Sequence, residues 1–489
     1  MEYNLKHFIN GEFVESFDNK RFEFLNPSNN ETIGTIPVGC KEDVDFAVRS
    51  AKKAFQIWSN IPASKRSDIL HEVARLIRKN REELARLETL NTGIPITQTR
   101  AQIDRAAENF DFFADMITKL SDEVYVDDVN NFVNYVIRTP IGVAGLITPW
   151  NTPLMLETWK IAPCLAAGDT CVLKPAEWTP LSANRLAEII SDAGVPPGVF
   201  NIVHGIGEIS GAALVAHPEV RLISFTGETT TGMEIMRNGA SSLKRFSMEL
   251  GGKNPAIIFS DADLERALDA VIFMAYSLNG ERCTSNSRVL IEASIYEKFL
   301  EMLYERVKKI RVGDPFDEKT ELGPLVRPEH WKRVKDYIDI GIREGAKLIY
   351  GGDRPSGFDK GNYLMPTLFA NGERNMRIFK EEIFGPVLLA VKFKDEEEAI
   401  SLANDVIYGL TAYIWTKDIQ KANRVAKRIE AGMVWINSHN VRDLRTPFGG
   451  AKYSGIGREG GKYSFDFYME IKTIQVALGT HKIPTFGKS

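Results

Sequence analysis

The chain has little that would tie it to a metal centre, a disulfide scaffold or a membrane. Its 489 residues include only four cysteines, at positions 40, 164, 171 and 283, and none of their spacings resembles the C-x-x-C pair of metal and redox sites. No window reaches about 18 apolar residues, and the N-terminus lacks the apolar segment of a signal peptide. The net charge of −4 comes from interspersed acids and bases, so no basic surface favours nucleic acid or an anionic membrane. We therefore expect a globular, cytoplasmic protein of about three domains that binds no metal.

The N-terminal part is expected to start with a β-hairpin and to continue with surface helices. The dipeptide Asn-Gly at 10–11 lies between short apolar runs, and it supplies the positive φ angles of a type I′ turn. Apolar residues at helical spacing, with many charges between them, then predict amphipathic helices over 42–58, 63–90 and 101–119.

From residue 132 onward, short apolar runs that are typical of buried strands alternate with amphipathic segments. The first series is 141–147, 170–173, 200–203, 222–225 and 256–259, and the second is 287–291, 387–393, 411–416 and 433–437. Alternation of this kind predicts an α/β fold with parallel, doubly wound sheets, the second domain beginning after about residue 252. Two further strand-like runs, 132–137 and 471–477, fit neither series and are expected to form a small separate sheet.

A cysteine and a glutamate, Cys283 and Glu249, are the first candidates for catalysis. A free cysteine is usually a buried apolar residue, but Cys283 lies in the polar run 279–285, which favours an exposed turn that enters a helix. The helix dipole would acidify the thiol there, and Arg282 would add positive potential. A thiolate attacks carbonyl carbon, and a carboxylate is suited to deprotonating the water that releases the acyl group.

Three glycine patterns are candidates for binding a dinucleotide. The run 455–460 matches G-x-G-x-x-G, but no βαβ unit follows it, so we interpret it as a turn. The run 205–211 follows a predicted strand, although its middle spacing is one residue too long, and 225–232 joins a strand to a helix whose N-terminus suits a pyrophosphate. Lys174 and Glu177 follow another strand, where the carboxylate would bind ribose hydroxyls and repel a 2′-phosphate, which favours NAD over NADP.

Seven motifs, spread over most of the chain, carry more information together than any one of them does alone. They are Pro149 to Pro153, Leu173 to Glu177, Phe225 to Gly232, Met248 to Lys253, Cys283, Glu382 to Val387 and Pro447 to Gly450. In this order they resemble the aldehyde dehydrogenase superfamily, nearly end to end. The resemblance implies a Rossmann-type NAD-binding domain over 1–121 and 141–251, an α/β catalytic domain over 252–455, and a small β bridging element over 122–140 and 456–489. It also implies a small-molecule aldehyde as substrate and a homodimer or homotetramer joined through the bridging element.

The resemblance implies a role for each motif residue. Cys283 would attack the aldehyde, Asn151 with a backbone N–H would bind the oxyanion, and Glu249 would activate the hydrolytic water after hydride transfer to NAD. The implied NAD-binding residues are Trp150, Lys174, Glu177, Gly207, Gly211, Thr226, Gly227, Gly232, Leu250, Glu382 and Phe384. Two positions depart from the family pattern, because Glu281 stands where many members have Gln and Glu228 where many have a small hydroxyl residue.

Two arginines indicate which aldehyde is oxidised. Arg442 precedes the motif that includes Phe448, in a wall of the aldehyde tunnel where the family often has an apolar residue, and Arg105 is on the helix that resembles the opposite wall. Guanidinium groups suit carboxylates, so these three residues are expected to bind a carboxylate-bearing semialdehyde. The alternative is that each arginine pairs with an internal acid, such as Asp443 or Asp104.

Other substrates and other classes of function stay open at this point. The segments 442–447 and 460–468 resemble, within that family, the hydroxymuconic semialdehyde dehydrogenases of aromatic ring cleavage. Betaine-type or general aliphatic aldehydes are the alternative substrates, which Arg442 disfavours. A catalytically silent structural protein or a thioester hydrolase is the alternative of another class, but neither would need the residues that are implied to bind NAD. Glu249 favours a free acid product over an acyl-CoA.

Overall fold

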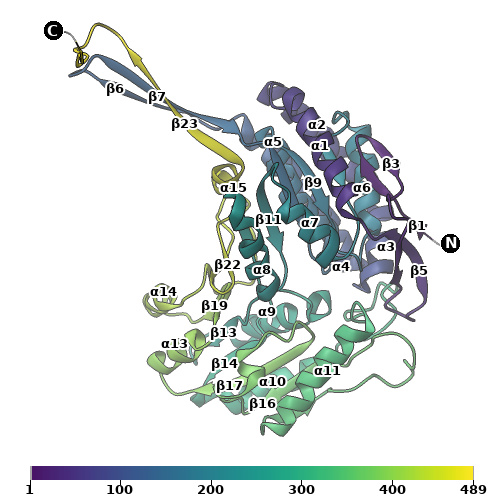
Figure 1. Ribbon diagram of the computed structural model, residues 1–489. Coiled ribbons are helices and arrows are strands. Elements are labelled where there is room, and N and C mark those ends of the chain that lie inside the picture. Colours follow the sequence, from purple (N-terminus) through teal and green to yellow (C-terminus); the bar gives the residue numbers. More distant parts are fainter. Residues whose placement is uncertain (1–2, 488–489) are drawn as a thin grey trace.

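The structure is a computed structural model that describes residues 3–487. Two α/β units lie one above the other, and a narrow β-sheet arm extends from the upper unit, with the C-terminus near its tip (Figure 1). Its helices are α1 (Lys41–Trp58), α2 (Ala63–Lys79), α3 (Arg81–Thr92), α4 (Ile96–Ile117), α5 (Pro153–Ala167), α6 (Leu181–Asp192), α7 (Ala212–Ala216), α8 (Thr229–Gly239), α9 (Leu264–Tyr276), α10 (Tyr296–Val307), α11 (Pro328–Arg343), α12 (Arg377–Lys380), α13 (Glu396–Asn404), α14 (Ile419–Arg428) and α15 (Gly461–Tyr468). Within residues 3–487, no helix combines the length and the apolar character needed to cross a membrane.

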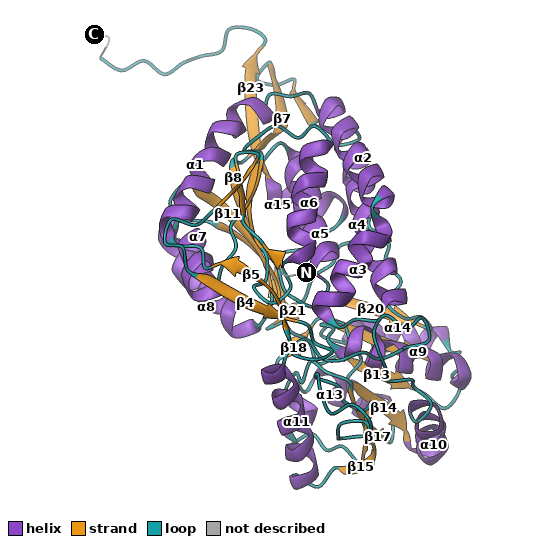
Figure 2. Ribbon diagram, turned by 90° about the vertical axis from the view of Figure 1, so that its right-hand side faces the viewer, coloured by secondary structure: helices purple, strands orange, loops and turns teal. Residues whose placement is uncertain are grey.

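The first sheet has eight strands and carries helices on both faces. In spatial order they are β22 (Gly455–Ile456), β12 (Arg245–Glu249), β11 (Val220–Thr226), β8 (Val143–Ile147), β9 (Thr170–Lys174), β10 (Phe200–Ile202), β2 (His7–Ile9) and β3 (Glu12–Val14). The strands from β12 to β10 are parallel. Along β8, Val143 and Ile147 pack on one face with α1, α7 and α8, whereas Ala144 and Leu146 pack on the other with α2, α4, α5 and α6 (Figure 2). This is the doubly wound arrangement expected from the sequence.

The second sheet has seven strands and again two helical layers. Their order is β15 (Lys347–Tyr350), β16 (Thr367–Ala370), β17 (Val387–Phe393), β14 (Arg288–Glu292), β13 (Pro255–Ile258), β19 (Thr411–Trp415) and β20 (Met433–Ile436). The grouping of the predicted strand 256–259 with the first sheet is wrong. The chain crosses to the second unit directly after β12, so β13 pairs with β14 and β19 instead.

The arm contains the two strand-like runs, 132–137 and 471–477, that fitted neither series of strands in the sequence, and they pair with each other. It consists of β6 (Glu123–Asp127), β7 (Phe132–Pro140) and β23 (Met469–Ala477), with β7 in the middle. Two small sheets complete the strands: β1 (Tyr3–Asn4), β5 (Thr32–Pro37) and β4 (Arg21–Leu25), and β18 (Tyr408–Gly409) with β21 (Ala451–Lys452). The domain division given above stays a prediction, but β22 joins the first sheet and α15 packs against α5, so residues 455–468 associate with the first unit before the chain enters the arm.

Two local expectations are tested directly. Asn10 and Gly11 have φ angles of 55° and 84°, as a type I′ turn requires. The single helix expected over 63–90 is two helices, because the chain leaves helical geometry at Asn80 (φ −101°, ψ 18°), whose side-chain amide donates back to the carbonyl of Leu76 at 2.8 Å.

Candidate active site

Cys283 lies in a buried loop between α9 and β14. The loop is held by Asn279, whose amide nitrogen donates to the carbonyls of Gly93 (3.1 Å) and Pro324 (2.9 Å) and whose oxygen accepts the N–H of Gly323 (2.8 Å). The expectation of an exposed turn entering a helix is wrong, because the next regular element is the strand β14. Asn279 and Glu281 of this run point inwards and bond to neighbouring backbone.

The surroundings of Cys283 raise the pKa of its thiol, whereas the sequence analysis expected them to lower it. Burial raises its pKa to about 12, the carboxyl groups of Glu382 and Glu249 add to the rise, and Arg282 opposes it only in part. The thiol is therefore protonated at neutral pH. Because the thiolate is the nucleophile, an attack on an aldehyde requires a nearby group that takes the thiol proton.

Glu249 ends β12 and is the carboxylate that could take this proton. Both of its oxygens are buried and have no hydrogen-bond partner in the described residues. Burial raises its pKa well above the usual range, and Glu459 raises it further. The two glycines that follow β12 are packed closely against other segments. A Cβ at Gly251 would lie 2.4 Å from Glu382, and one at Gly252 would lie 2.5 Å from the carbonyl oxygen of Cys283. The Gly-Gly pair thus lets the strand end approach the thiol loop.

A buried ion pair behind Glu249 was missed by the sequence analysis. Lys160, on α5, donates to Glu459 at 2.9 Å and to the hydroxyl of Ser224 at 2.8 Å, and Ser247 also donates to Glu459 at 3.1 Å. Lys160 lowers the pKa of Glu249, whereas Glu459 raises it. The sequence signal was a lysine in an otherwise mostly apolar helix, together with an acid inside the 455–460 run that we interpreted only as a turn.

Asn151 follows β8 and reaches the same loop. Its amide nitrogen donates to the carbonyl of Glu281 at 2.8 Å, which leaves its second N–H available. Glu281 itself is buried, accepts the N–H of Val326 at 3.0 Å, and lies 3.6 Å from His330. Burial raises the pKa of Glu281 well above its usual range, which favours the neutral acid, a group of the same shape as the glutamine that the family resemblance implied at this position.

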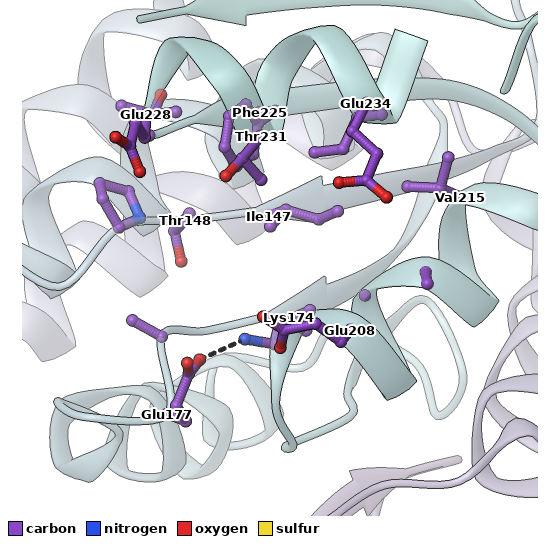
Figure 3. Close-up of a pocket in the computed structure, with 18 of the residues that line it drawn as sticks. Ile147, Thr148, Lys174, Glu177, Glu208, Val215, Phe225, Glu228, Thr231 and Glu234 are labelled. Atoms are coloured by element: carbon purple, nitrogen blue, oxygen red, sulfur yellow. Dashed lines mark hydrogen bonds and ion pairs between the residues drawn. The ribbon is translucent and has the colours of Figure 1, made fainter. Parts of the chain in front are cut away.

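The cavity at the carboxyl ends of β8, β9 and β11 has the properties of a dinucleotide site. It measures about 350 Å³ and contains the Lys174–Glu177 ion pair, 2.7 Å long (Figure 3). A Cβ at Gly207 or Gly211 would meet nothing within 4 Å, so both glycines face open space. The hydroxyl of Thr226 lines the cavity and is buried without a partner. Carboxylate, ammonium and free hydroxyl groups around such a space suit ribose and phosphate.

A second cavity of about 290 Å³ continues from the first to the thiol. Eight residues that were expected to contact NAD or the aldehyde line it: Trp150, Asn151, Thr226, Gly227, Leu250, Cys283, Glu382 and Phe384. Trp150, Thr226, Gly227 and Glu228 line both cavities, so one extended ligand can occupy them together. The carboxylate of Glu382 accepts the N–H of Gly252 at 2.8 Å, and burial raises its pKa to about 7.

Not every expected cofactor residue lies on a cavity wall. Gly232 does not line either space; a Cβ there would lie 2.7 Å from a methyl group of Leu250, so this glycine supports the wall from behind. His330 and Arg333 line the second cavity and were not predicted. Glu228 faces both cavities (Figure 3), so an acid does adjoin the space where a pyrophosphate would pass.

Arg442 lies near the thiol and within electrostatic reach of Arg105, and neither arginine forms a salt bridge among residues 3–487. The Arg442 guanidinium lies 4.9 Å from the ring centre of Trp159 and 4.1 Å from that of Phe448, and its Nη2 is buried with no partner. Burial lowers its pKa to about 10, and the charge of Arg105 lowers it further. The internal acids considered for them are occupied elsewhere: Asp443 pairs with Arg445 at 2.7 Å, and Asp104 pairs with Arg81 at 2.6 Å.

Comparisons with known proteins agree with this geometry. Residues 13–474 match the model described as the aldehyde dehydrogenase family. The chain is 48% identical to 5-carboxymethyl-2-hydroxymuconate semialdehyde dehydrogenase of Escherichia coli, over 94% of this chain and 98% of the relative, and 44% identical to betaine aldehyde dehydrogenase of Bacillus subtilis, over 96% of each.

Solved structures show the same likeness in three dimensions. The crystal structure of HpcC from Thermus thermophilus has a TM-score of 0.97 and 52% identity, covering 99% of this chain and 95% of that one. Betaine aldehyde dehydrogenase from Staphylococcus aureus, in complex with NAD+, has a TM-score of 0.96 and 41% identity, covering 99% and 96%. With the thiol, the buried carboxylate and the dinucleotide cavity in place, the chain belongs to the aldehyde dehydrogenase family.

Proposed function

We propose that the protein is an NAD-dependent dehydrogenase that oxidises a carboxylate-bearing semialdehyde to the free acid. The substrate we infer is 5-carboxymethyl-2-hydroxymuconate semialdehyde, formed in 4-hydroxyphenylacetate catabolism, because a relative with 48% identity carries that name. The observation that carries the proposal is the pair Arg105 and Arg442. Arg442 lies near Cys283 and within electrostatic reach of Arg105, and neither arginine forms a salt bridge within residues 3–487. An unpaired buried guanidinium is costly, and a substrate carboxylate would offset that cost.

The chain's own residues supply the acid and base steps. Glu249 would take the proton of the Cys283 thiol as the sulfur bonds to the aldehyde carbon, and the carbonyl electron pair would move to the oxygen. The free N–H of Asn151 would bind that oxygen, and one such donor typically contributes ~3–4 kcal/mol in the transition state. Lys174 and Glu382 would hold NAD, which would supply the acceptor for the hydride lost when the Cys283 adduct becomes a thioester. Glu249 would first pass the thiol proton to solvent and would then take a proton from the water that attacks the thioester. The C–S bond would break as the acid is released, and the Cys283 sulfur would recover a proton.

Betaine aldehyde is the main competing substrate, since betaine aldehyde dehydrogenases are 41–44% identical to this chain. A trimethylammonium group binds to the faces of aromatic rings. The rings of Trp159 and Phe448 are already covered by Arg442, whose charge would repel a cationic substrate. Residue chemistry therefore favours the anionic semialdehyde over the cationic one. 2-Hydroxymuconate semialdehyde is a second anionic candidate, because 2-hydroxymuconic semialdehyde dehydrogenase of Pseudomonas is 42% identical.

The test is NADH formation with neutral, cationic and carboxylate-bearing aldehydes. Arg442→Ala should lower kcat/KM for anionic relative to neutral aldehydes by roughly 10–100-fold, as expected for one lost hydrogen bond to a charged group. An unchanged ratio would remove the carboxylate clamp from the proposal. Cys283→Ala is the control for the chemistry, because any turnover that survives it would exclude Cys283 as the nucleophile.

We also infer that the arm joins copies of the chain. Val124, Tyr125 and Val126 of β6 are 64%, 56% and 63% exposed, which is unusual for consecutive apolar residues of a monomer. An exposed strand edge is a ready surface for pairing. Sedimentation of the wild-type protein should show a dimer or tetramer, and a monomer at micromolar concentration would contradict this inference.

A further inference from the structure

A third guanidinium, that of Arg282, adjoins the thiol and has no part in the reaction described so far. Its Nε donates to the hydroxyl of Thr284 at 3.0 Å, and its Nη1 donates to the hydroxyl of Ser277 at 3.0 Å. The guanidinium carbon lies 5.8 Å from the ring centre of Phe273. No salt bridge to this side chain forms within residues 3–487, so its bonds go to neutral partners only and its charge is uncompensated.

Arg282 is half-buried and lies beside an open hollow. Phe273, on which its guanidinium lies, lines an open hollow of about 440 Å³ together with His439 and Val441. The hollow shares no lining residue with either dinucleotide cavity. The ring of His439 lies 5.4 Å from that of Phe273, so the 437–447 segment and α9 form its two sides.

Hydrogen bonds connect Arg282 to the segment that carries Arg442. The hydroxyl of Thr284 accepts from Arg282 and also from the amide of Asn440 at 3.3 Å. The amide oxygen of Asn440 and the Nη2 of Arg442 are both buried, and neither has a hydrogen-bond partner in the described residues. The wall on this side of the thiol therefore presents both an unused acceptor and an unused cationic donor, which is the pattern of a polar site awaiting a ligand.

The three arginines are within electrostatic reach of one another. The charge of Arg282 lowers the pKa of Arg105, and the charge of Arg105 lowers that of Arg442, in each case after the larger effect of burial. Three like charges that repel one another are retained at a cost. A single carboxylate held by Arg105 and Arg442 carries one negative charge, so it would leave the charge of Arg282 uncompensated.

We propose that Arg282 is a specificity-determining residue that binds a second anionic group of the substrate, distinct from the carboxylate held by Arg105 and Arg442. The proposal rests on the proposed function and extends it. It follows that the enzyme distinguishes aldehydes with two carboxylates from aldehydes with one, and that Arg282 is the residue that makes this distinction.

The experiment compares kcat/KM for aldehydes of matched length with two, one or no carboxylates. Arg282→Gln should lower the value for the dicarboxylate by roughly 10–100-fold more than the value for the monocarboxylate, and Arg282→Lys should recover part of the loss. Any effect of Arg282 on the reactivity of Cys283 is shared by all aldehydes, so it cancels in the ratio of kcat/KM for the dicarboxylate to kcat/KM for the monocarboxylate. Arg424→Gln is the matched control, because Arg424 is exposed and pairs with Glu396 at the surface; it should leave both values unchanged.

The outcomes separate the two proposals. An equal loss on the dicarboxylate and the monocarboxylate in Arg282→Gln overturns the role of Arg282, and so does a wild-type enzyme that shows no preference between them. The wild-type preference should also shrink as salt rises from about 0.05 to 0.5 M, because salt screens charge attraction; this measurement decides the matter if the variant does not fold. A wild-type preference for neutral aldehydes over both anions would instead overturn the proposed function.

Discussion

Replacing Glu88 by glutamine should make the stability of the protein much less dependent on pH. Glu88 is 1% exposed and fixes the start of α5, which follows the Asn151 loop. Its Oε1 accepts the N–H of Leu154 at 2.7 Å and the hydroxyl of Ser182 at 2.9 Å, whereas its Oε2 is buried with no partner. Glutamine keeps an oxygen for both bonds and replaces the unpaired oxygen with an amide that cannot ionise.

The magnitude follows from the titration of this carboxyl. Burial raises the pKa of Glu88 from 4.5 to about 7. Between these values the unfolded chain loses the proton while the folded chain keeps it, so the free energy of unfolding falls as pH rises from 4.5 to about 7. At ~1.4 kcal/mol per pKa unit, the full loss is ~3 kcal/mol. Glu88→Gln has no carboxyl at this position to ionise, so its free energy of unfolding should exceed that of the wild type by ~3 kcal/mol at high pH.

Thermal unfolding of both proteins at a series of pH values between about 5 and 8.5 measures the effect. The gain of Glu88→Gln over the wild type should be small at the acidic end and should grow through neutral pH. Glu83→Gln is the control, since Glu83 is an exposed residue of the same helix and pairs with Arg185 at the surface. A gain that does not change with pH, or one that Glu83→Gln reproduces, would refute the reasoning about burial.

Three further predictions concern the thiol and the groups behind it. The rate of Cys283 alkylation by iodoacetamide should keep rising from about pH 6 to 10, because burial keeps the thiol protonated; a plateau near neutral pH would contradict this. Glu249→Gln should lower steady-state turnover by ~10²–10⁴-fold and should also suppress the burst of NADH, because Glu249 takes the thiol proton before hydride transfer. Wild-type turnover should rise with pH as the raised pKa of Glu249 is passed. A variant that keeps the full burst would confine Glu249 to hydrolysis of the thioester. Lys160→Met should destabilise the fold by about 3–5 kcal/mol, because it leaves Glu459 buried and unpaired; denaturant unfolding with an unchanged midpoint would show that the ion pair contributes nothing.

Sequence patterns predicted the regular elements better than the surroundings of the site. The strands were recognisable because a strand buried on both faces is a continuous apolar run, as in β8 and β14. The exposed setting expected for Cys283 was wrong because Asn279 and Glu281 are 0% and 1% exposed, and their polar atoms bond to buried backbone. Polarity in a sequence shows that a side chain needs partners, but only the fold shows whether water or protein provides them.

The ion pair of Lys160 with Glu459 could not be predicted for a related reason. The two residues lie on α5 and just after β22, and only the pairing of β22 with β12 brings them together. The same holds for the unpaired state of Arg442, which depends on Asp443 being taken by Arg445. A local pattern identifies a charged residue, whereas its partner is set by contacts between distant segments.

The arm also has a consequence for synthesis of the chain. β23 pairs with β7 along its whole length, from Met469 with Pro140 to Ala477 with Phe132, and β22 completes the first sheet beside β12. β7 and β12 are synthesised long before β23 and β22, the strands that pair with them, leave the ribosome. The nascent chain therefore carries two open strand edges through the synthesis of the entire second unit, and non-local pairing of this kind is slow and exposed to aggregation. A nonsense mutation near the 3′ end of the gene would thus damage the first-made half of the protein rather than the last.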